Sequence, residues 1–493
     1  MRITPDQIRD DLRMLATVTR CVRTYGVDQG IDAVPMVARE LGLQVVLGTW
    51  IGREAARNEA ELSRALALAR EYRDVVRLLV VGNEVLLRGE QTPQAMAALL
   101  ARARAQSPVP VTYADVWEFW LRHADALRGQ VDVVTVHILP YWEDEPVGID
   151  TAVAHVLAVT ARVRERFGAQ PLFIGETGWP AEGRQRGPAR PGVVEQTRFV
   201  RELLAVQSGL PPLNIIEAFD QPWKRQLEGA VGGAWGLLDA EGQPRVMLAG
   251  PVHRPAWKNG LLIAALGGAL LGGVAAAMSA ARWRARGHKF QAACRGAALV
   301  IVAAASAAAT VWQVHLMAAI SRSGTEWLMT GAASLAGLGG CAVALYALHA
   351  LHDTNDTLPK HRHTAALRWA AAALMLVFVL LLWHLAFSGR YRMLLWPLPF
   401  VGAWALALAC TLQAPIATPD PGTTQAHSGA GWLRGVVAAL ALLGTACAAA
   451  ILWHEGPHNA QAAWLAASWL ALLVSAWHAA APHRPPGAVA TGP

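Results

Sequence analysis

The pattern of apolar and polar positions changes near residue 257 of this chain. Before that point, short apolar runs alternate with stretches in which apolar residues recur every three or four positions. Such runs predict buried β-strands, and the three-and-four spacing predicts amphipathic helices. After that point, long apolar segments follow one another with few charges between them. The pattern therefore predicts two domains, residues 1–257 and residues 258–493.

The first domain is predicted to be an α/β fold. Amphipathic helices are expected at Ala60–Tyr72, Pro93–Ala105, Ile149–Phe167 and Val194–Gln207. Alternating strands and helices predict a parallel sheet covered by helices, and about 250 residues is typical of one (β/α)8 barrel. We therefore predict a TIM-type barrel, of which this chain supplies seven strands. These strands are Arg20–Gly26, Leu43–Trp50, Val76–Val85, Val109–Val116, Val131–Leu139, Pro171–Trp179 and Leu213–Asp220.

The second domain is predicted to be all-α and polytopic in a membrane. A helix needs about 20 apolar residues to cross a bilayer, and alanine and glycine let helices approach closely in lipid. By this measure we predict seven transmembrane helices. They are expected near Gly260–Ala280, Gly296–Ile320, Trp327–Ala350, Trp369–Phe387, Leu394–Leu412, Gly435–Trp453 and Ala462–Ala479.

The charges support a membrane location for this second domain. Residues 258–493 hold five acidic residues and 14 lysines and arginines, which leaves 31 acidic and 29 basic residues for residues 1–257. The overall charge of +7 thus belongs to the apolar half and is no argument for nucleic acid. Basic loops of membrane proteins stay in the cytoplasm. We therefore expect a multi-pass protein of the cell inner membrane with its first domain periplasmic. Two basic loops predict this orientation. The loop after the first span contains Arg282, Arg284, Arg286, Lys289 and Arg295, and the loop after the third contains Lys360, Arg362 and Arg368.

Two predicted strands end on a glutamate. The third strand runs into Asn83 and Glu84, and the sixth contains Glu176. Because the carboxyl ends of barrel strands meet at one face, we expect both carboxylates at that face. Retaining glycoside hydrolysis requires two carboxylates about 5 Å apart, one acting as acid/base and one as nucleophile.

At these motifs the chain resembles glycoside hydrolase family 17, and most closely its bacterial membrane-anchored branch. The resemblance implies that Glu84 is the general acid/base and Glu176 the nucleophile. It also implies action on β-(1→3)- and β-(1→6)-glucans. The matching motifs are Val22-Arg23-Thr24-Tyr25, Val81-Gly82-Asn83-Glu84, Gly175-Glu176-Thr177-Gly178-Trp179-Pro180, Phe219-Asp220-Gln221-Pro222-Trp223-Lys224 and Trp235-Gly236-Leu237.

In this superfamily the acid/base follows strand 4 and the nucleophile follows strand 7, whereas our count gives 3 and 6. The start of the chain, Met1 to Asp6, also lacks the charged and apolar regions of an export signal. Either the first domain is cytoplasmic, or the start of the protein lies upstream. We predict the second: the first barrel strand is missing from this chain and is encoded upstream of Met1, behind a signal-anchor.

Further residues at the strand ends are candidates for glucan binding. Asn83 is expected to bind the sugar 2-hydroxyl, and Arg23 and Lys224 to orient Glu176. For each of these residues, core packing, a turn or an ordinary salt bridge is the alternative. Neither metal-ligand spacing nor a nucleotide-binding motif is present, so we expect no metal and no cofactor. The remaining candidates, mostly aromatic platforms for sugar rings, are Tyr25, Tyr113, His137, Tyr141, Trp179, Asp220 and Trp223.

The predicted function is a membrane-anchored, retaining enzyme that cleaves β-(1→3)-glucan and transfers glucosyl chains to form β-(1→6) linkages or branches. An endo-β-1,3-glucan hydrolase is one alternative, because the sequence does not show whether water or a sugar attacks the intermediate. A processive synthase is another, although no motif for an activated donor is present. The third is a non-catalytic protein that binds or exports glucan. The expected partners are β-glucan, the lipid bilayer and glucan-synthesis proteins, but no nucleic acid.

Overall fold

The computed structural model describes residues 2–252, 255–285, 289–350, 357–387, 389–413 and 431–480. It divides into two compact units. The first comprises Met1–Glu182, Pro188–Pro222 and Gly232–Val252, and the second comprises Gly183–Gly187, Trp223–Val231 and His253–Pro493.

The first unit contains a parallel sheet of seven strands, which confirms the seven predicted runs. Each strand pairs with the next one along the chain, in the order β1 to β7. This order is what successive strand–helix–strand crossovers produce. The strands are β1 (Cys21–Arg23), β2 (Gln44–Thr49), β3 (Val76–Asn83), β4 (Val111–Val116), β5 (Val133–His137), β6 (Leu172–Thr177) and β7 (Leu213–Ile215).

The sheet curls into a nearly closed barrel. Val46 of β2 and Phe173 of β6 belong to one buried cluster, together with Leu78, Val80 and Ala114. Strands so far apart in a flat sheet do not share a cluster, since neighbouring strands lie about 4.8 Å apart. The predicted TIM-type α/β arrangement is therefore confirmed for the described strands.

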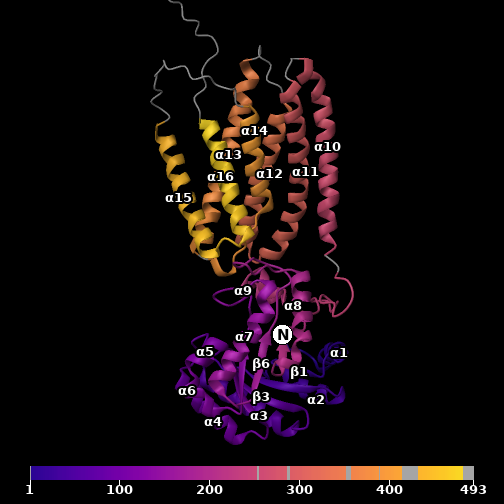
Figure 1. The fold of residues 1–493 in the computed structure, drawn as a ribbon, viewed down its shortest axis with the longest axis vertical. Coiled ribbons are helices and arrows are strands. Elements are labelled where there is room, and N and C mark those ends of the chain that lie inside the picture. The colour runs from indigo at the N-terminus through magenta and orange to yellow at the C-terminus, as the bar shows by residue number, and fades with distance from the viewer. Residues whose placement is uncertain are drawn as a thin grey trace, which may run out of the picture. The chain divides into compact units, whose positions relative to one another are not determined.

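Helices connect the strands and lie around the outside of the sheet (Figure 1). The four predicted helices are present as α3, α4, α7 and α8, and α7 has the predicted bounds. Before β1, Thr4 and Gln7 form a capping box at the start of α1. The helices are α1 (Pro5–Leu15), α2 (Val34–Glu40), α3 (Ala55–Glu71), α4 (Pro93–Gln106), α5 (Trp117–Arg122), α6 (Ala124–Leu127), α7 (Ile149–Phe167) and α8 (Val193–Ala205).

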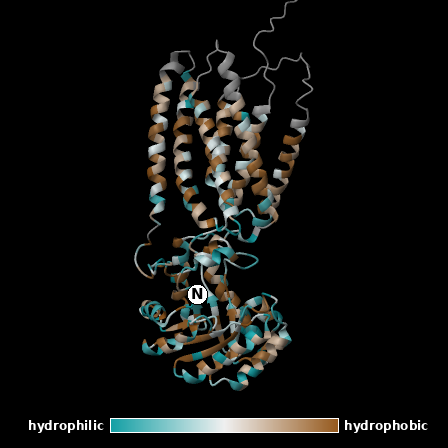
Figure 2. Ribbon diagram, turned by 180° about the vertical axis from the view of Figure 1, so that it is seen from behind, coloured by the Kyte–Doolittle hydropathy of each residue, from teal (hydrophilic) through white to brown (hydrophobic). Residues whose placement is uncertain are grey.

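The described part of the second unit contains the short α9 (Arg225–Glu228) and seven apolar helices. Six of the apolar helices are long and apolar enough to cross a membrane. The predicted span Leu394–Leu412 forms the exception, because its helix α14 has only 17 residues. Figure 2 shows apolar residues along most of the length of these helices. They are α10 (Trp257–Ala285), α11 (Lys289–Ile320), α12 (Gly324–His349), α13 (Thr357–Phe387), α14 (Pro397–Gln413), α15 (Gly431–Glu455) and α16 (Ala460–Ala480).

Small residues bring these helices together, as predicted. A Cβ atom at Gly337 of α12 would lie 2.5 Å from the backbone of Leu398 in α14, so only glycine permits this approach. The basic residues after the third span lie differently from the prediction. Lys360, Arg362 and Arg368 fall within α13, because this helix begins well before the apolar run. Arg286 of the first basic loop lies outside the described residues.

Candidate active site

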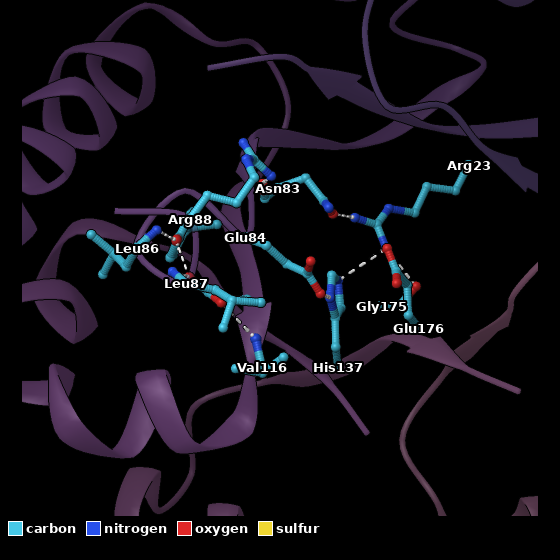
Figure 3. Close-up of polar contacts among 12 residues, drawn as sticks. Arg23, Asn83, Glu84, Leu86, Leu87, Arg88, Val116, His137, Gly175 and Glu176 are labelled. Atoms are coloured by element: carbon cyan, nitrogen blue, oxygen red, sulfur yellow. Dashed lines mark hydrogen bonds and ion pairs between the residues drawn. The ribbon is translucent and has the colours of Figure 1, made fainter. Parts of the chain in front are cut away.

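Two glutamates meet at the carboxyl end of the barrel strands. Glu84 directly follows β3, and Glu176 lies near the end of β6. His137, the last residue of β5, stands between them (Figure 3). One carboxylate oxygen of each glutamate and one ring nitrogen of His137 all lie within 4.8 Å of one another.

The backbone turns sharply at Glu84. Its φ is +51°, in the left-handed region that residues other than glycine rarely adopt. The peptide N–H of Glu84 donates to the carbonyl of Ala114 at 2.8 Å. Gly82, with φ of +85°, begins the turn, and a Cβ atom there would lie 2.7 Å from the side chain of Val85. The turn directs the Glu84 carboxyl toward His137 instead of continuing the strand.

Arg23, at the end of β1, connects the two glutamate strands. Its Nη1 donates to the carbonyl of Gly175 at 2.6 Å and lies 3.4 Å from Glu176 Oε1. Its Nη2 donates to Asn83 Oδ1 at 2.6 Å. The side chains of Arg23 and Glu176 are 1% and 6% exposed. A buried carboxylate needs such a partner, and arginine keeps its charge at any physiological pH.

His137 is neutral near pH 7. Complete burial lowers the pKa of its imidazole to about 4, although the charge of Glu176 acts in the opposite direction. Its Nε2 lies 3.3 Å from Nη1 of Arg23, which can only donate. Nε2 is therefore the acceptor, and Nδ1–H donates to Oε1 of Glu84 at 2.8 Å.

Tyr25 lies beside Glu176 and Arg23. Burial, followed by the charge of Glu176, raises the pKa of the Tyr25 hydroxyl well above its usual value. The hydroxyl therefore keeps its proton beside the Glu176 carboxylate. The guanidinium of Arg23 lies 4.6 Å from the centre of the Tyr25 ring and fixes its position.

Glu84, His137 and Glu176 also have the spacing of a metal site. Arg23, however, lies within 3.5 Å of both His137 Nε2 and Glu176 Oε1. A fixed positive charge against two of the three donors opposes the binding of a cation. Two carboxylates, a neutral imidazole and a guanidinium instead form a constellation suited to acid/base and nucleophilic chemistry.

Comparison with known proteins agrees with this geometry. Residues 2–236 match the family model described as the BtgE/BtgC glycoside hydrolase domain. This part of the chain is therefore a glycoside hydrolase domain, and it is similar to that family. The match supports the predicted resemblance to glycoside hydrolase family 17.

Several relatives resemble the glycoside hydrolase domain. A glucan 1,3-beta-glucosidase of Arthroderma benhamiae is 29% identical, over 45% of this chain and 78% of the relative. One from Schizosaccharomyces pombe is 27% identical, over 44% and 73%. The match to a probable beta-glucosidase of Aspergillus fumigatus, at 26% identity, spans 39% of that protein. A solved structure, a family 17 beta-1,3-glucanosyltransferase from Rhizomucor miehei, is 26% identical with a TM-score of 0.45, covering 50% of this chain and 92% of that one.

Three of the predicted platforms in the glycoside hydrolase domain are buried rings. Tyr113 and Tyr141 are 0% exposed and Trp179 is 1% exposed. Tyr141 packs edge-on against Trp179, whose Nε1 donates to the carbonyl of Arg190 at 3.0 Å. In the structure these rings pack against neighbouring residues near the strand ends. Their contact with glucan stays a prediction.

The other predicted residues lie after β7. Asp220 accepts a hydrogen bond from the peptide N–H of Gly236 at 2.9 Å and pairs with Arg245, which ties together the segments after β7. Trp223 and Lys224 form part of the short 3-10 helix η4 (Pro222–Lys224) and belong to the second unit. The glucan contacts predicted for Asp220 and Trp223, and the orienting role predicted for Lys224, stay predictions.

Two residues of the site were not predicted as site residues. Asp115 of β4 is fully buried and faces the segment after Glu84. Arg88 donates to the carbonyls of Asn83 and Ile51. A charged residue within an apolar strand was the available signal for Asp115, because burying a lone carboxylate is costly. Nothing in the sequence pattern marks Arg88.

Proposed function

We propose that the glycoside hydrolase domain is a retaining enzyme acting on β-(1→3)-glucan, with Glu84 as acid/base and Glu176 as nucleophile. The observation that supports this most is the separation of the two carboxylates, whose nearest oxygens lie within 4.8 Å. Retaining enzymes hold their carboxyl groups about 5 Å apart, whereas inverting enzymes leave about 6.5–9.5 Å for a water molecule.

In the first step, protonated Glu84 gives its proton to the glycosidic oxygen. The ionised carboxylate of Glu176 attacks the anomeric carbon, the bond to the leaving sugar breaks, and an ester joins Glu176 to the glycosyl group. Arg23, whose Nη1 lies 3.4 Å from Glu176 Oε1, orients this carboxylate for the attack.

In the second step, Glu84 acts as the base. It takes the proton of an incoming hydroxyl, the hydroxyl oxygen attacks the anomeric carbon, and the ester bond to Glu176 breaks. Water as the acceptor gives hydrolysis, and a sugar hydroxyl gives transfer. We propose transfer that forms β-(1→6) linkages or branches. The resemblance to the membrane-anchored branch of family 17 favours this acceptor.

The substrate proposal has two supports. The relatives from Arthroderma benhamiae and Schizosaccharomyces pombe are named glucan 1,3-beta-glucosidases. In addition, the amide of Asn83 is oriented by Arg23. Because a guanidinium only donates, the amide oxygen faces Arg23 and the NH2 group is presented as a donor. That donor suits the 2-hydroxyl oxygen of the bound sugar.

Incubation of the detergent-solubilised protein with laminari-oligosaccharides tests this proposal. We expect products longer than the substrate, including branched ones, and we expect Glu176→Ala to abolish them. Glu202→Ala, a change on an outer helix, is the matched control and should keep activity. Shorter products alone would refute transfer, and unchanged turnover in Glu176→Ala would refute the mechanism.

We further propose that the chain is a multi-pass inner-membrane protein with an extracytoplasmic catalytic domain, in contact with glucan-synthesis proteins. Six helices with the length and composition of membrane spans support the membrane location. The side is tested by labelling Ser63→Cys, an exposed position on α3, in a Cys21→Ser background. A membrane-impermeant maleimide should label it in spheroplasts, whereas labelling only after lysis would reverse the proposed orientation.

A further inference from the structure

A buried tyrosine–aspartate pair lies beside the proposed acid/base. Tyr113 and Asp115 lie two positions apart on β4, so their side chains leave the same face of the strand. Both are 0% exposed, and the Tyr113 hydroxyl donates to Asp115 Oδ2. Neither residue belongs to the two-carboxylate mechanism described above.

The pair binds the backbone that follows Glu84. The peptide N–H of Leu86 donates to the Tyr113 hydroxyl at 2.9 Å, and the peptide N–H of Leu87 points to Asp115 Oδ2 at 3.4 Å (Figure 3). The other oxygen of Asp115 accepts from the peptide N–H of Val116 at 2.8 Å. The loop after Glu84 is thus tied to β4 by side chains instead of by strand pairing.

This attachment matters because the loop begins at a strained residue. A left-handed conformation is unfavourable for a residue such as Glu84, so it persists only where the surroundings impose it. The hydrogen bonds to Leu86 and Leu87 come two and three residues after Glu84 and supply that constraint.

The charge of Asp115 acts on the same glutamate. Burial, together with the nearby charge of Glu84, raises the pKa of Asp115 to about 6, although the hydrogen bonds it accepts work against this. The groups facing the pair are Glu84 and Arg88, from the loop after β3. The repulsion between these two carboxyl groups is mutual.

We propose that Tyr113 and Asp115 are positioning residues for the acid/base: they hold the turn that aims Glu84 at the glycosidic oxygen. This proposal rests on the retaining mechanism proposed above. It also gives Tyr113 a role other than the predicted contact with glucan.

Leaving groups that differ in their need for a proton provide the test. The variants are Asp115→Asn and Tyr113→Phe, and the substrates are laminari-oligosaccharides and 2,4-dinitrophenyl β-laminaribioside. A dinitrophenolate leaves without protonation, whereas a sugar alcohol requires it. We expect kcat/KM on the oligosaccharides to fall about 10- to 100-fold in both variants, part of the total worth of an acid catalyst. The kcat/KM of the aryl substrate, which reports the first step alone, should change by less than about threefold.

Asp132→Asn is the matched control. Asp132 Oδ2 accepts from the peptide N–H of Val111 at 2.8 Å, the same kind of bond at the opposite end of β4. This variant should reduce both activities equally, if at all. Equal losses on both substrates in Asp115→Asn and Tyr113→Phe, or a pattern like that of Asp132→Asn, would overturn the positioning role.

Failure of the proposed function gives a different result. In that case Glu176→Ala would turn over each substrate at the wild-type rate, or neither the wild-type protein nor Glu176→Ala would turn over either substrate. If Asp115→Asn does not fold, Tyr113→Phe decides the question, because it removes one hydroxyl and leaves the carboxylate in place. A loss in Tyr113→Phe confined to the oligosaccharides supports the proposal, and an equal loss on both substrates overturns it.

Discussion

His137 and Asp115 are expected to make the stability of the barrel depend on pH in opposite directions. Burial lowers the pKa of His137 from 6.5 to about 4 and raises that of Asp115 from 3.8 to about 6. Both shifts fall in the same range of pH, so the two effects oppose each other in the wild-type protein. Removing either residue should expose the effect of the other.

For His137, the unfolded chain binds a proton between pH 4 and 6.5 that the folded chain does not. Stability therefore rises with pH across this window and is lost on acidification. The fall in the pKa of His137 from 6.5 to about 4 corresponds to about 3.4 kcal/mol in the free energy of unfolding, at about 1.36 kcal/mol for each pKa unit. The loss of stability caused by His137→Gln, measured relative to the wild-type protein, should be largest at pH 7 and smallest at pH 4.

For Asp115 the sign is reversed. Between pH 3.8 and 6 the folded chain holds a proton that the unfolded chain releases, so stability falls as the pH rises. The rise in the pKa of Asp115 from 3.8 to about 6 corresponds to about 3 kcal/mol in the free energy of unfolding. The destabilisation caused by Asp115→Asn should therefore grow as the pH falls. In the wild-type protein these two contributions should nearly cancel, within about 1 kcal/mol.

Hydrogen exchange read by mass spectrometry provides the assay. Peptides from β3 to β6 report the opening free energy of the barrel in the intact, solubilised chain. Measurements between pH 4 and 7, corrected for intrinsic exchange rates, give the difference between each variant and the wild type. The reasoning would be refuted if both differences were independent of pH, or if both had the same slope.

Three further predictions concern the site. With azide as external nucleophile, Glu84→Ala should yield a β-glycosyl azide and Glu176→Ala an α-glycosyl azide, as identified by NMR; the reverse pattern would exchange their roles. Arg23→Lys should lower kcat/KM about 100-fold, because a single ammonium cannot replace the fork between Gly175, Glu176 and Asn83, whereas Arg104→Lys at the other end of the barrel should leave it unchanged. Gly82→Ala should lower the melting temperature and the activity together, since its φ is +85° and its Cβ would strike Val85; an alanine variant with wild-type values in both would contradict this.

The barrel was predictable from the sequence because its signals are local. The apolar runs that became β1 to β7 are bounded by polar residues, and α7 has the predicted bounds, Ile149–Phe167. The prediction was less accurate in the apolar half. There the helices extend beyond their apolar runs, so that Lys360 lies in α13 instead of a loop. Hydropathy reports the lipid-facing length of a helix and not where its hydrogen bonds end.

The site was predictable to the extent that its residues directly follow strands. Glu84, Glu176, Arg23 and His137 all stand at strand ends, and the structure brings these four together. The support around Glu84 was not predictable. Asp115 lies 31 positions along the chain from Glu84, on the next strand, and its role depends on a turn with positive φ that no periodicity announces.

The surroundings of the two glutamates differ in a way that supports their separate roles. Glu176 lies within the paired β6, and the guanidinium of Arg23 lies 3.4 Å from its carboxylate. Glu84 lies just outside β3, beside a neutral imidazole and a buried carboxyl group. A nucleophile must stay ionised until it reacts, whereas an acid/base must gain and lose a proton in every cycle. A fixed cation serves the first requirement and opposes the second. The position of Arg23 against Glu176, and of Asp115 near Glu84, therefore favours the assignment of roles on electrostatic grounds that do not depend on family resemblance.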